Sequence, residues 1–163
     1  MTTAYLDTSA LVRLVRREPG SELAAALWNR APIVATSRTS DVELRAVLAA
    51  GTRRGLLSED EHAVALEEWS HLWPALYVVE TTRAVADRAA QLVAAHPLRG
   101  GDAVHLASAL LFAPDVVVAV WDEHVAAAAE SEGLTVLPGR YTVHERHVPR
   151  PSTRRGATGA ADE

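Results

Sequence analysis

The chain has 163 residues, a length that suits one domain with its own core. It contains no cysteine, which excludes disulfides and thiolate metal sites, and its apolar runs are too short to span a bilayer. The net charge is −5 and every basic residue is an arginine, so a polyanion would bind at a local patch or through metal ions. We expect a cytoplasmic protein that does not contact a membrane.

Hydrophobic patterning predicts strands that alternate with helices along most of the chain. Short apolar segments bounded by turn residues indicate strands, and apolar residues at helical spacing fill the intervals between them. The predicted strands are Thr3 to Asp7, Ile33 to Ala35, Leu76 to Val79, Val116 to Val120 and Leu134 to Leu137. The predicted helices are Ala10 to Arg17, Ser21 to Trp28, Ser37 to Ala50, Ser58 to Leu72, Thr82 to His96, Asp102 to Phe112 and Asp122 to Ser131.

This alternation is typical of the α/β class, with a parallel sheet covered by helices on both faces. Right-handed crossovers place helices on both faces only if the strand order reverses somewhere in the sheet. Ligands of such sheets bind at the carboxyl ends of the strands, at that reversal. Residues 1–138 are expected to form this domain. Residues 139–163, rich in Pro, Gly, Ser, Thr and Arg, are expected to be a mostly flexible C-terminal extension.

Four acidic residues occupy positions that would bring them to the same edge of the predicted sheet. Asp7 ends the first strand, and Asp122 follows the most apolar strand. Asp102 opens a helix after two glycines, and Glu43 lies one turn into the helix that follows the second strand. Because strand ends and the following helix starts share one edge, the first two acids belong there, and the other two lie nearby if their helices start there.

Each acid taken alone has a simpler explanation as a helix cap. Asp is a favoured N-cap residue, and Ser40 to Glu43 matches a capping box. The four together are more informative, because two carboxylates about 4 Å apart repel by roughly 4 kcal/mol at an effective dielectric near 20. Converging acids must therefore bind a divalent metal or become protonated. Oxygen ligands suit Mg²⁺ or Mn²⁺, which can activate water to attack a phosphodiester.

Other proteins with an acid at the end of the first strand fit less well. A receiver domain needs a lysine, and the chain has none. A haloacid-dehalogenase-like phosphatase would have a second Asp where this chain has Ser9. The chain also lacks both the G-x-G-x-x-G fingerprint after its first strand and the G-x-x-x-x-G-K-[ST] loop, which argues against nucleotide cofactors.

Four motifs in this order resemble the PIN domain family, and more narrowly the VapC-type toxins of bacterial toxin–antitoxin pairs. They are YLDTSALVRL, SDVELRAVL, GGDAVHLASAL and VVVAVWDEHVAAAA, and the resemblance covers residues 3 to 137. It implies a three-layer α/β/α sandwich around a central parallel sheet of four to five strands. It also implies an endoribonuclease that depends on Mg²⁺ or Mn²⁺, a cognate antitoxin as partner, and a homodimer.

The resemblance also suggests a role for each acid. Asp7, Glu43, Asp102 and Asp122 match the four acids of the family. By this match Asp7 and Asp102 would bind the metal directly. The other two would complete the site through water and orient the attacking hydroxide. Ser9 matches a small polar position that can form hydrogen bonds within the site.

One residue departs from the family pattern. Members often have Thr or Ser two residues before the fourth acid, where this chain has Val120. The departure weakens the assignment of Asp122, for which Glu123 is a possible substitute. It also leaves open a second function, in which a catalytically weak PIN domain serves as an RNA-binding or protein-interaction module. Retention of all four acids favours the nuclease.

Two further residues near the third motif are candidates for substrate contacts. Arg99 precedes the two glycines and Asp102, and we expect it to contact an RNA phosphate. His105 lies three residues after Asp102, on nearly the same helix face. It could contact the substrate or support the metal site, although a role in helix packing is the simpler interpretation.

Overall fold

The computed structural model describes residues 2–139. The predicted extension, apart from Gly139, lies outside the described residues. Within residues 2–139, no helix is long and apolar enough to cross a membrane.

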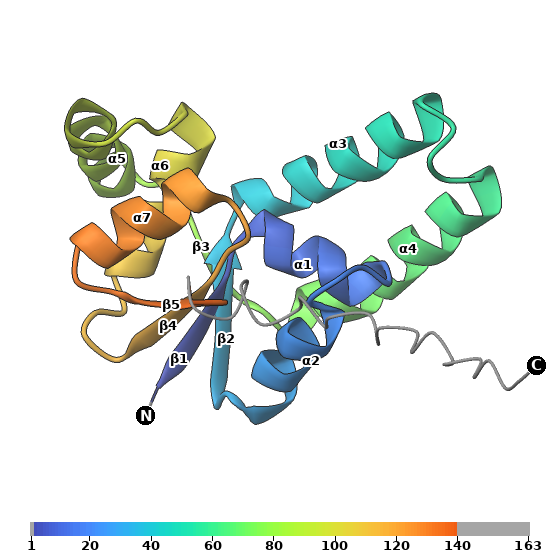
Figure 1. Ribbon diagram of the computed structural model, residues 1–163, viewed down its shortest axis with the longest axis horizontal. Helices are drawn as coiled ribbons and strands as arrows, with labels where there is room; N and C mark the ends of the chain where they lie inside the picture. Colours follow the sequence, from blue (N-terminus) through green and yellow to red (C-terminus); the bar gives the residue numbers. More distant parts are fainter. Residues whose placement is uncertain (1, 140–163) are drawn as a thin grey trace, which may run out of the picture.

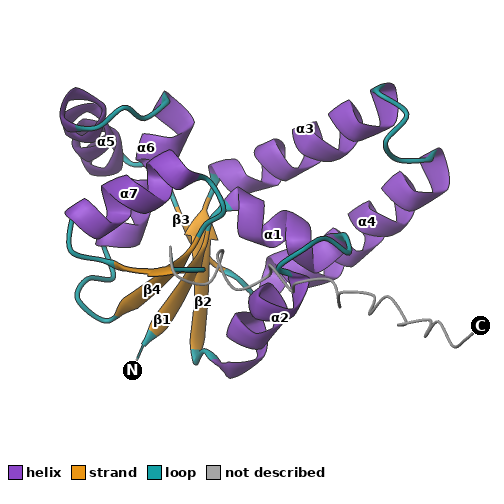
Figure 2. Cartoon of the chain, viewed as in Figure 1, coloured by secondary structure: helices purple, strands orange, loops and turns teal. Residues whose placement is uncertain are grey.

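Over residues 2–139 the sheet has five parallel strands in the order β3-β2-β1-β4-β5 (Figure 2). They are β1 (Thr3–Leu6), β2 (Ile33–Ser37), β3 (Tyr77–Val79), β4 (Val116–Ala119) and β5 (Thr135–Leu137). All five predicted strands are present, with ends that differ from the predicted ones by a residue or two. The α/β class and the parallel sheet are confirmed.

Seven α-helices cover the two faces of the sheet within the described part of the chain (Figure 1). The first four lie on one face and the last three on the other, which gives the predicted three-layer sandwich. They are α1 (Thr8–Val15), α2 (Ser21–Arg30), α3 (Thr39–Arg53), α4 (Glu59–Leu72), α5 (Arg83–Ala95), α6 (Gly100–Leu110) and α7 (Glu123–Ser131), and a 3-10 turn at Trp73–Ala75 follows α4.

Alternation along the central strand divides the core in two. Tyr5 packs into the cluster formed with α5, α6 and α7. Its neighbours Ala4 and Leu6 pack into the cluster formed with α1, α3 and α4. Successive side chains of a strand point to opposite faces, so a strand buried on both sides is apolar at nearly every position. This explains the uninterrupted apolar pattern of β1 and β4.

The strand order reverses beside β1. The chain runs from β1 outward through β2 to β3, then crosses back to place β4 on the other side of β1. The carboxyl ends of β1 and β4 therefore flank the reversal, which is where parallel α/β sheets bind their ligands. Asp7 follows β1 directly, and Asp122 follows β4.

One expected capping box and one predicted helix start were wrong. The capping box from Ser40 to Glu43 does not form, because α3 already begins at Thr39 and the Ser40 hydroxyl lies 2.6 Å from that of Thr36. Likewise α6 begins at Gly100 and not at Asp102, whose carboxylate accepts a hydrogen bond from the backbone of the preceding turn. Helix capping therefore does not explain Glu43.

Candidate active site

Asp7 is fixed at the junction of β1 and α1. It is the N-cap of α1, and its Oδ2 accepts hydrogen bonds from the Ser9 backbone nitrogen at 3.0 Å and from Ser9 Oγ at 2.8 Å. Ser9 Oγ in turn accepts a hydrogen bond from the Trp121 nitrogen at 3.0 Å. Ser9 thus orients Asp7 and ties the end of β1 to the loop after β4.

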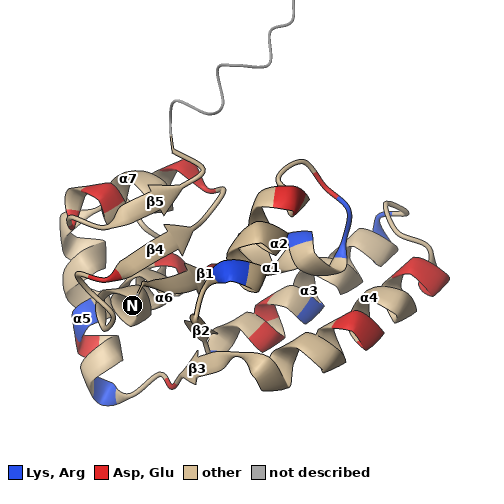
Figure 3. Ribbon diagram, turned by 90° about the horizontal axis from the view of Figure 1, so that it is seen from below, with Lys and Arg blue, Asp and Glu red and all other residues tan. Residues whose placement is uncertain are grey.

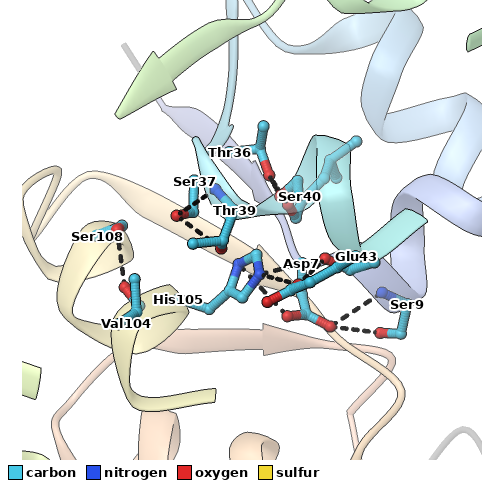
Figure 4. Close-up of polar contacts among 12 residues, drawn as sticks. Asp7, Ser9, Thr36, Ser37, Thr39, Ser40, Glu43, Val104, His105 and Ser108 are labelled. Carbon is cyan, nitrogen blue, oxygen red and sulfur yellow. Dashed lines mark hydrogen bonds and ion pairs between the residues drawn. The ribbon is translucent and has the colours of Figure 1, made fainter. Parts of the chain in front are cut away.

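His105 connects Asp7 to Glu43 (Figure 4). Its Nε2 lies 2.8 Å from Glu43 Oε2, and its Nδ1 lies 3.5 Å from Asp7 Oδ1. Thr8 also donates a 2.5 Å hydrogen bond to Glu43 Oε2. Residues from β1, α1, α3 and α6 therefore meet at this ring, which is 3% exposed. A ring so deeply buried offers no surface to RNA, which argues against the predicted substrate contact.

The buried ring and its neighbours shift one another's pKa values. Burial lowers the pKa of His105, but the charge of Asp7 and the hydrogen bond with Glu43 together outweigh it, so this pKa is raised overall. The same hydrogen bond is the main cause that lowers the pKa of Glu43, against the effect of its partial burial. Burial, and then the charge of Asp7, raises the pKa of Tyr5 well above its ordinary value. Tyr5 therefore stays a neutral hydroxyl beside charged Glu43.

The other two acids are bridged by Arg99. Its Nε lies 3.3 Å from Asp102 Oδ2, and its Nη2 lies 3.8 Å from Asp122 Oδ2. Asp122 also caps α7, since its Oδ1 accepts hydrogen bonds from the nitrogens of His124 and Val125. The Arg99 side chain is 84% exposed, so water screens these ion pairs and leaves the guanidinium free to move to another anion.

The start of α6 brings the two pairs of acids towards each other. A Cβ atom on Gly101 would lie only 3.2 Å from Glu43 Oε1, so the helix backbone closely approaches that carboxylate. The charge of Asp102, the next residue, contributes to the raised pKa of His105. Asp7, Glu43 and Asp102 are thus near the same imidazole. Asp122 is joined to them only through Arg99.

The donor chemistry fits a hard divalent cation, although the side chains do not form a finished metal site. In residues 2–139, no group of three or more His, Asp or Glu side chains is arranged to hold a metal ion. Instead, two nitrogen-bearing side chains lie between the acids: the His105 imidazole between Asp7 and Glu43, and the Arg99 guanidinium between the other two. Four carboxylates at a strand reversal are the oxygen donors that Mg²⁺ and Mn²⁺ prefer.

Sequence reasoning missed three residues of this site. Tyr5 lies 3.0 Å from His105 Nδ1, Thr8 lies 3.2 Å from Nε2, and Gly101 makes room for Glu43. The period of a strand gives a signal for Tyr5, because it stands two residues before Asp7 and so faces the same side. The position of Thr8, directly after the acid, gave a weaker signal.

Val120 takes no part in the site. Its side chain is 1% exposed and packs in the core cluster with α5, α6 and α7, and its backbone nitrogen donates to Leu137 at 3.0 Å. A hydroxyl is therefore not needed to support the core at this position.

Comparison with known proteins gives consistent matches. The family model for the PIN domain matches residues 4–117. Ribonuclease VapC45 of Mycobacterium tuberculosis is 45% identical over 141 residues, which cover 86% of this chain and 98% of that protein. Among solved structures, FitAcB from Neisseria gonorrhoeae matches with a TM-score of 0.62 and 22% identity, covering 82% of this chain and 95% of that one. A toxin–antitoxin complex from Klebsiella pneumoniae matches with a TM-score of 0.55 and 18% identity, covering 76% and 90%.

The two structural matches are below 25% identity and support the fold alone. The family model and the 45% identical relative each span most of the chain. The four motifs, the reversed parallel sheet and these two matches agree, and the chain belongs to the PIN domain family as a relative of the VapC ribonucleases.

Proposed function

We propose that this protein is an endoribonuclease that depends on Mg²⁺ or Mn²⁺ and hydrolyses RNA phosphodiester bonds. In the cell it would act as a toxin in the cytoplasm and be held in check by an antitoxin protein. The observation that carries the proposal is the meeting of Asp7, Glu43 and the start of α6 around one buried imidazole, at the reversal of the strand order. A relative 45% identical over most of the chain is named a ribonuclease, which supports the reaction class.

The residues would share the work as follows. Asp7 and Asp102 would hold the cation, which would supply a hydroxide at neutral pH and stabilise charge on the phosphate. Glu43, with a lowered pKa, stays ionised and can orient water beside the metal or accept its proton. Asp122 is the N-cap of α7 and would contact the cation through water. Arg99 would leave the two aspartates and pair with a phosphate.

RNA would approach from the solvent side of Arg99. A hollow of about 610 Å³ lies at the turn between α1 and α2 and is lined in part by Arg13, Arg16 and Arg17. Glu18 also lines it and forms ion pairs with the first two, so Arg17 is the candidate there for a phosphate contact. Arg13 links the hollow to the site, because its guanidinium carbon lies 4.3 Å from the centre of the Trp121 ring, and Trp121 directly precedes Asp122. Figure 3 shows acidic and basic segments interspersed over residues 2–139, so phosphate contacts would be local.

Protein partners have a plausible surface on the α3–α4 hairpin. Four apolar side chains there are 42–69% exposed, which is costly without a partner: Val42, Val47, Leu56 and Val64. We propose that an antitoxin or a second copy of the chain covers part of this surface. The toxin–antitoxin complex with the same fold supports a protein partner of this kind.

A cleavage assay tests the nuclease proposal. Purified protein is incubated with structured RNA in Mg²⁺, in Mn²⁺ or in EDTA, alongside Asp7→Asn and Asp60→Asn. The second variant removes an exposed carboxylate in the first turn of α4 and serves as the matched control. We expect metal-dependent cleavage that Asp7→Asn abolishes and Asp60→Asn retains. Cleavage in EDTA, or unchanged cleavage by Asp7→Asn, would contradict the proposal.

Expression in cells tests the toxin role separately. The parent protein should arrest growth, and Asp102→Asn at the same protein level should relieve the arrest. Growth arrest that persists with Asp102→Asn would instead support a non-catalytic module that binds RNA or protein.

A further inference from the structure

His105 makes more polar contacts than helix packing requires. The ring sits on the inner side of α6 at 3% exposure, yet both nitrogens face carboxylates: Nε2 lies 2.8 Å from Glu43 and Nδ1 lies 3.5 Å from Asp7 (Figure 4). Here a single ring links two of the acids assigned to the metal centre.

Two hydroxyl groups fix the orientation of the ring. The Tyr5 hydroxyl lies 3.0 Å from Nδ1, and the Tyr5 and His105 rings meet edge to face at 78°. Thr8 Oγ1 lies 3.2 Å from Nε2 and donates to the same oxygen of Glu43 that the imidazole contacts. With partners on both edges the ring cannot rotate without breaking buried hydrogen bonds and leaving their donors or acceptors unpaired.

An imidazole suits this place because it contacts both carboxylates while keeping them apart. The ion pair of Nδ1 with Asp7 is made to Oδ1, and Oδ2 of that residue accepts hydrogen bonds from Ser9. The ion pair of Nε2 with Glu43 is made to Oε2, and Oε1 of that residue faces the start of α6 at Gly101. Each carboxylate therefore has one oxygen held by the ring and the other turned elsewhere. A leucine would fill the space but hold neither.

We propose that His105 is a positioning residue that sets the separation and orientation of Asp7 and Glu43 for metal binding, with Tyr5 and Thr8 locking the ring. It contacts neither metal nor RNA and acts through the two carboxylates. The inference rests on the proposed metal-dependent function. Partners that orient metal ligands typically contribute 10–100-fold to metal affinity or activity.

The test measures Mn²⁺ binding to the metal-free protein by electron paramagnetic resonance, together with kcat and KM for RNA cleavage. His105→Leu should weaken Mn²⁺ binding by about 10- to 100-fold and lower kcat, with little change in the KM for RNA. His105→Gln retains an amide that reaches towards Glu43, so it should restore part of the Mn²⁺ affinity. Tyr5→Phe removes only the hydroxyl that locks the ring and should weaken binding less. These two milder variants decide the matter if His105→Leu does not fold.

His96→Leu is the matched control. His96 is the C-cap of α5, and its Nε2 lies 2.9 Å from a carboxylate oxygen of Glu132. Glu132 follows the C-terminal end of α7, whereas Asp122 caps the N-terminal end of that helix. Replacing His96 also removes a contact between an imidazole and a carboxylate, so this variant controls for the stability lost with such a contact. Mn²⁺ affinity should stay at the parental level in this variant.

The outcomes separate the two proposals. Parental Mn²⁺ affinity in His105→Leu and His105→Gln would overturn the positioning role and leave the nuclease proposal standing. A parent protein that binds Mn²⁺ but cleaves no RNA would overturn the proposed function, while weaker Mn²⁺ binding in the His105 variants would still support positioning. A parent protein that binds no Mn²⁺ would overturn both.

Discussion

Gly101 is the residue that allows α6 to start against Glu43. A Cβ atom there would lie 3.2 Å from the Glu43 carboxylate, closer than nearly all real Cβ contacts, whereas a Cβ atom on Gly100 would meet nothing within 4 Å. Both glycines lie in the first turn of α6. The pair therefore separates the effect of crowding the carboxylate from the effect of adding a methyl group to the helix.

Gly101→Ala should lower kcat for RNA cleavage by about tenfold, because Glu43 must move by a few tenths of an ångström and small misplacements in active sites are costly. Gly100→Ala should leave kcat unchanged and stabilise the fold by about 0.4–1 kcal/mol, since it restricts the unfolded chain. Cleavage kinetics and urea unfolding of both variants provide the measurement. Equal kcat values for the two variants would show that the position of Glu43 beside Gly101 does not affect RNA cleavage.

The sequence identifies the acids of the site, but it does not reveal the contacts that hold them in place. Asp7 and Asp122 could be placed at the strand reversal because each follows an apolar strand. The approach of His105 to Tyr5 could not, since these residues are 100 positions apart and the contact depends on the packing of α6 against β1. The pairing of Arg99 with both aspartates likewise depends on how two loops pack.

Between elements, the turn before α2 is packed against the loop that carries Asp122. Gly20 has a φ of +95°, and a Cβ atom there would lie 2.6 Å from the Trp121 ring. The Arg13 guanidinium covers that ring and donates a 2.9 Å hydrogen bond to Pro19. The indole thus couples the α1–α2 turn to the residue next to Asp122.

Gly20→Ala should destabilise the protein more than Gly133→Ala. Both glycines have positive φ, which costs other residues about 1–2 kcal/mol, but only Gly20 faces a ring, and Gly133 has open space. The clash should add about 1–3 kcal/mol and lower cleavage by displacing Trp121. Urea unfolding measures the difference. Equal destabilisation of the two variants would argue against the close packing of Trp121.

A hydrogen bond between α3 and α4 makes the stability depend on pH. Trp69 Nε1 donates to Asp41 at 2.7 Å and Arg45 donates at 2.9 Å, and these bonds outweigh desolvation and lower the pKa of Asp41. The stabilisation is present above the unfolded pKa near 3.9 and is lost as pH falls through the lower folded value. Trp69→Phe should raise this pKa in a carboxyl NMR titration. An unchanged titration would mean that Arg45 and the charge of Arg38 set it without the indole.

For the elements, hydrophobic patterning was sufficient to find each strand and its neighbouring helices. The start of α6 was misplaced, and the capping box expected at Ser40 does not form, because local capping signals were followed where tertiary contacts decide. Ser40 bonds to Thr36 on the preceding strand instead of capping its own helix. The two glycines before Asp102 belong to the helix, because its carboxylate accepts a bond from the Arg99 nitrogen. The capping box at Ser58 and Glu61, which involves only local contacts, forms as its sequence suggests.

In the whole molecule, the reversal of strand order beside β1 creates the site. It brings the first strand end and the fourth strand end together although 115 positions separate Asp7 from Asp122 in the numbering. Two of the chain's own side chains contact these acids, the buried His105 imidazole and the exposed Arg99 guanidinium. Because His105 is buried and Arg99 is exposed, we expect the imidazole to stay in place when a metal ion binds and the guanidinium to move away.

We predict that the acids at the strand reversal hold a divalent cation. Anomalous scattering from crystals soaked in Mn²⁺ would locate it. A Mn²⁺ peak should appear roughly 2 Å from carboxylate oxygens of both Asp7 and Asp102, with Arg99 withdrawn from Asp102. The absence of a peak there, at a Mn²⁺ concentration that supports RNA cleavage, would contradict it.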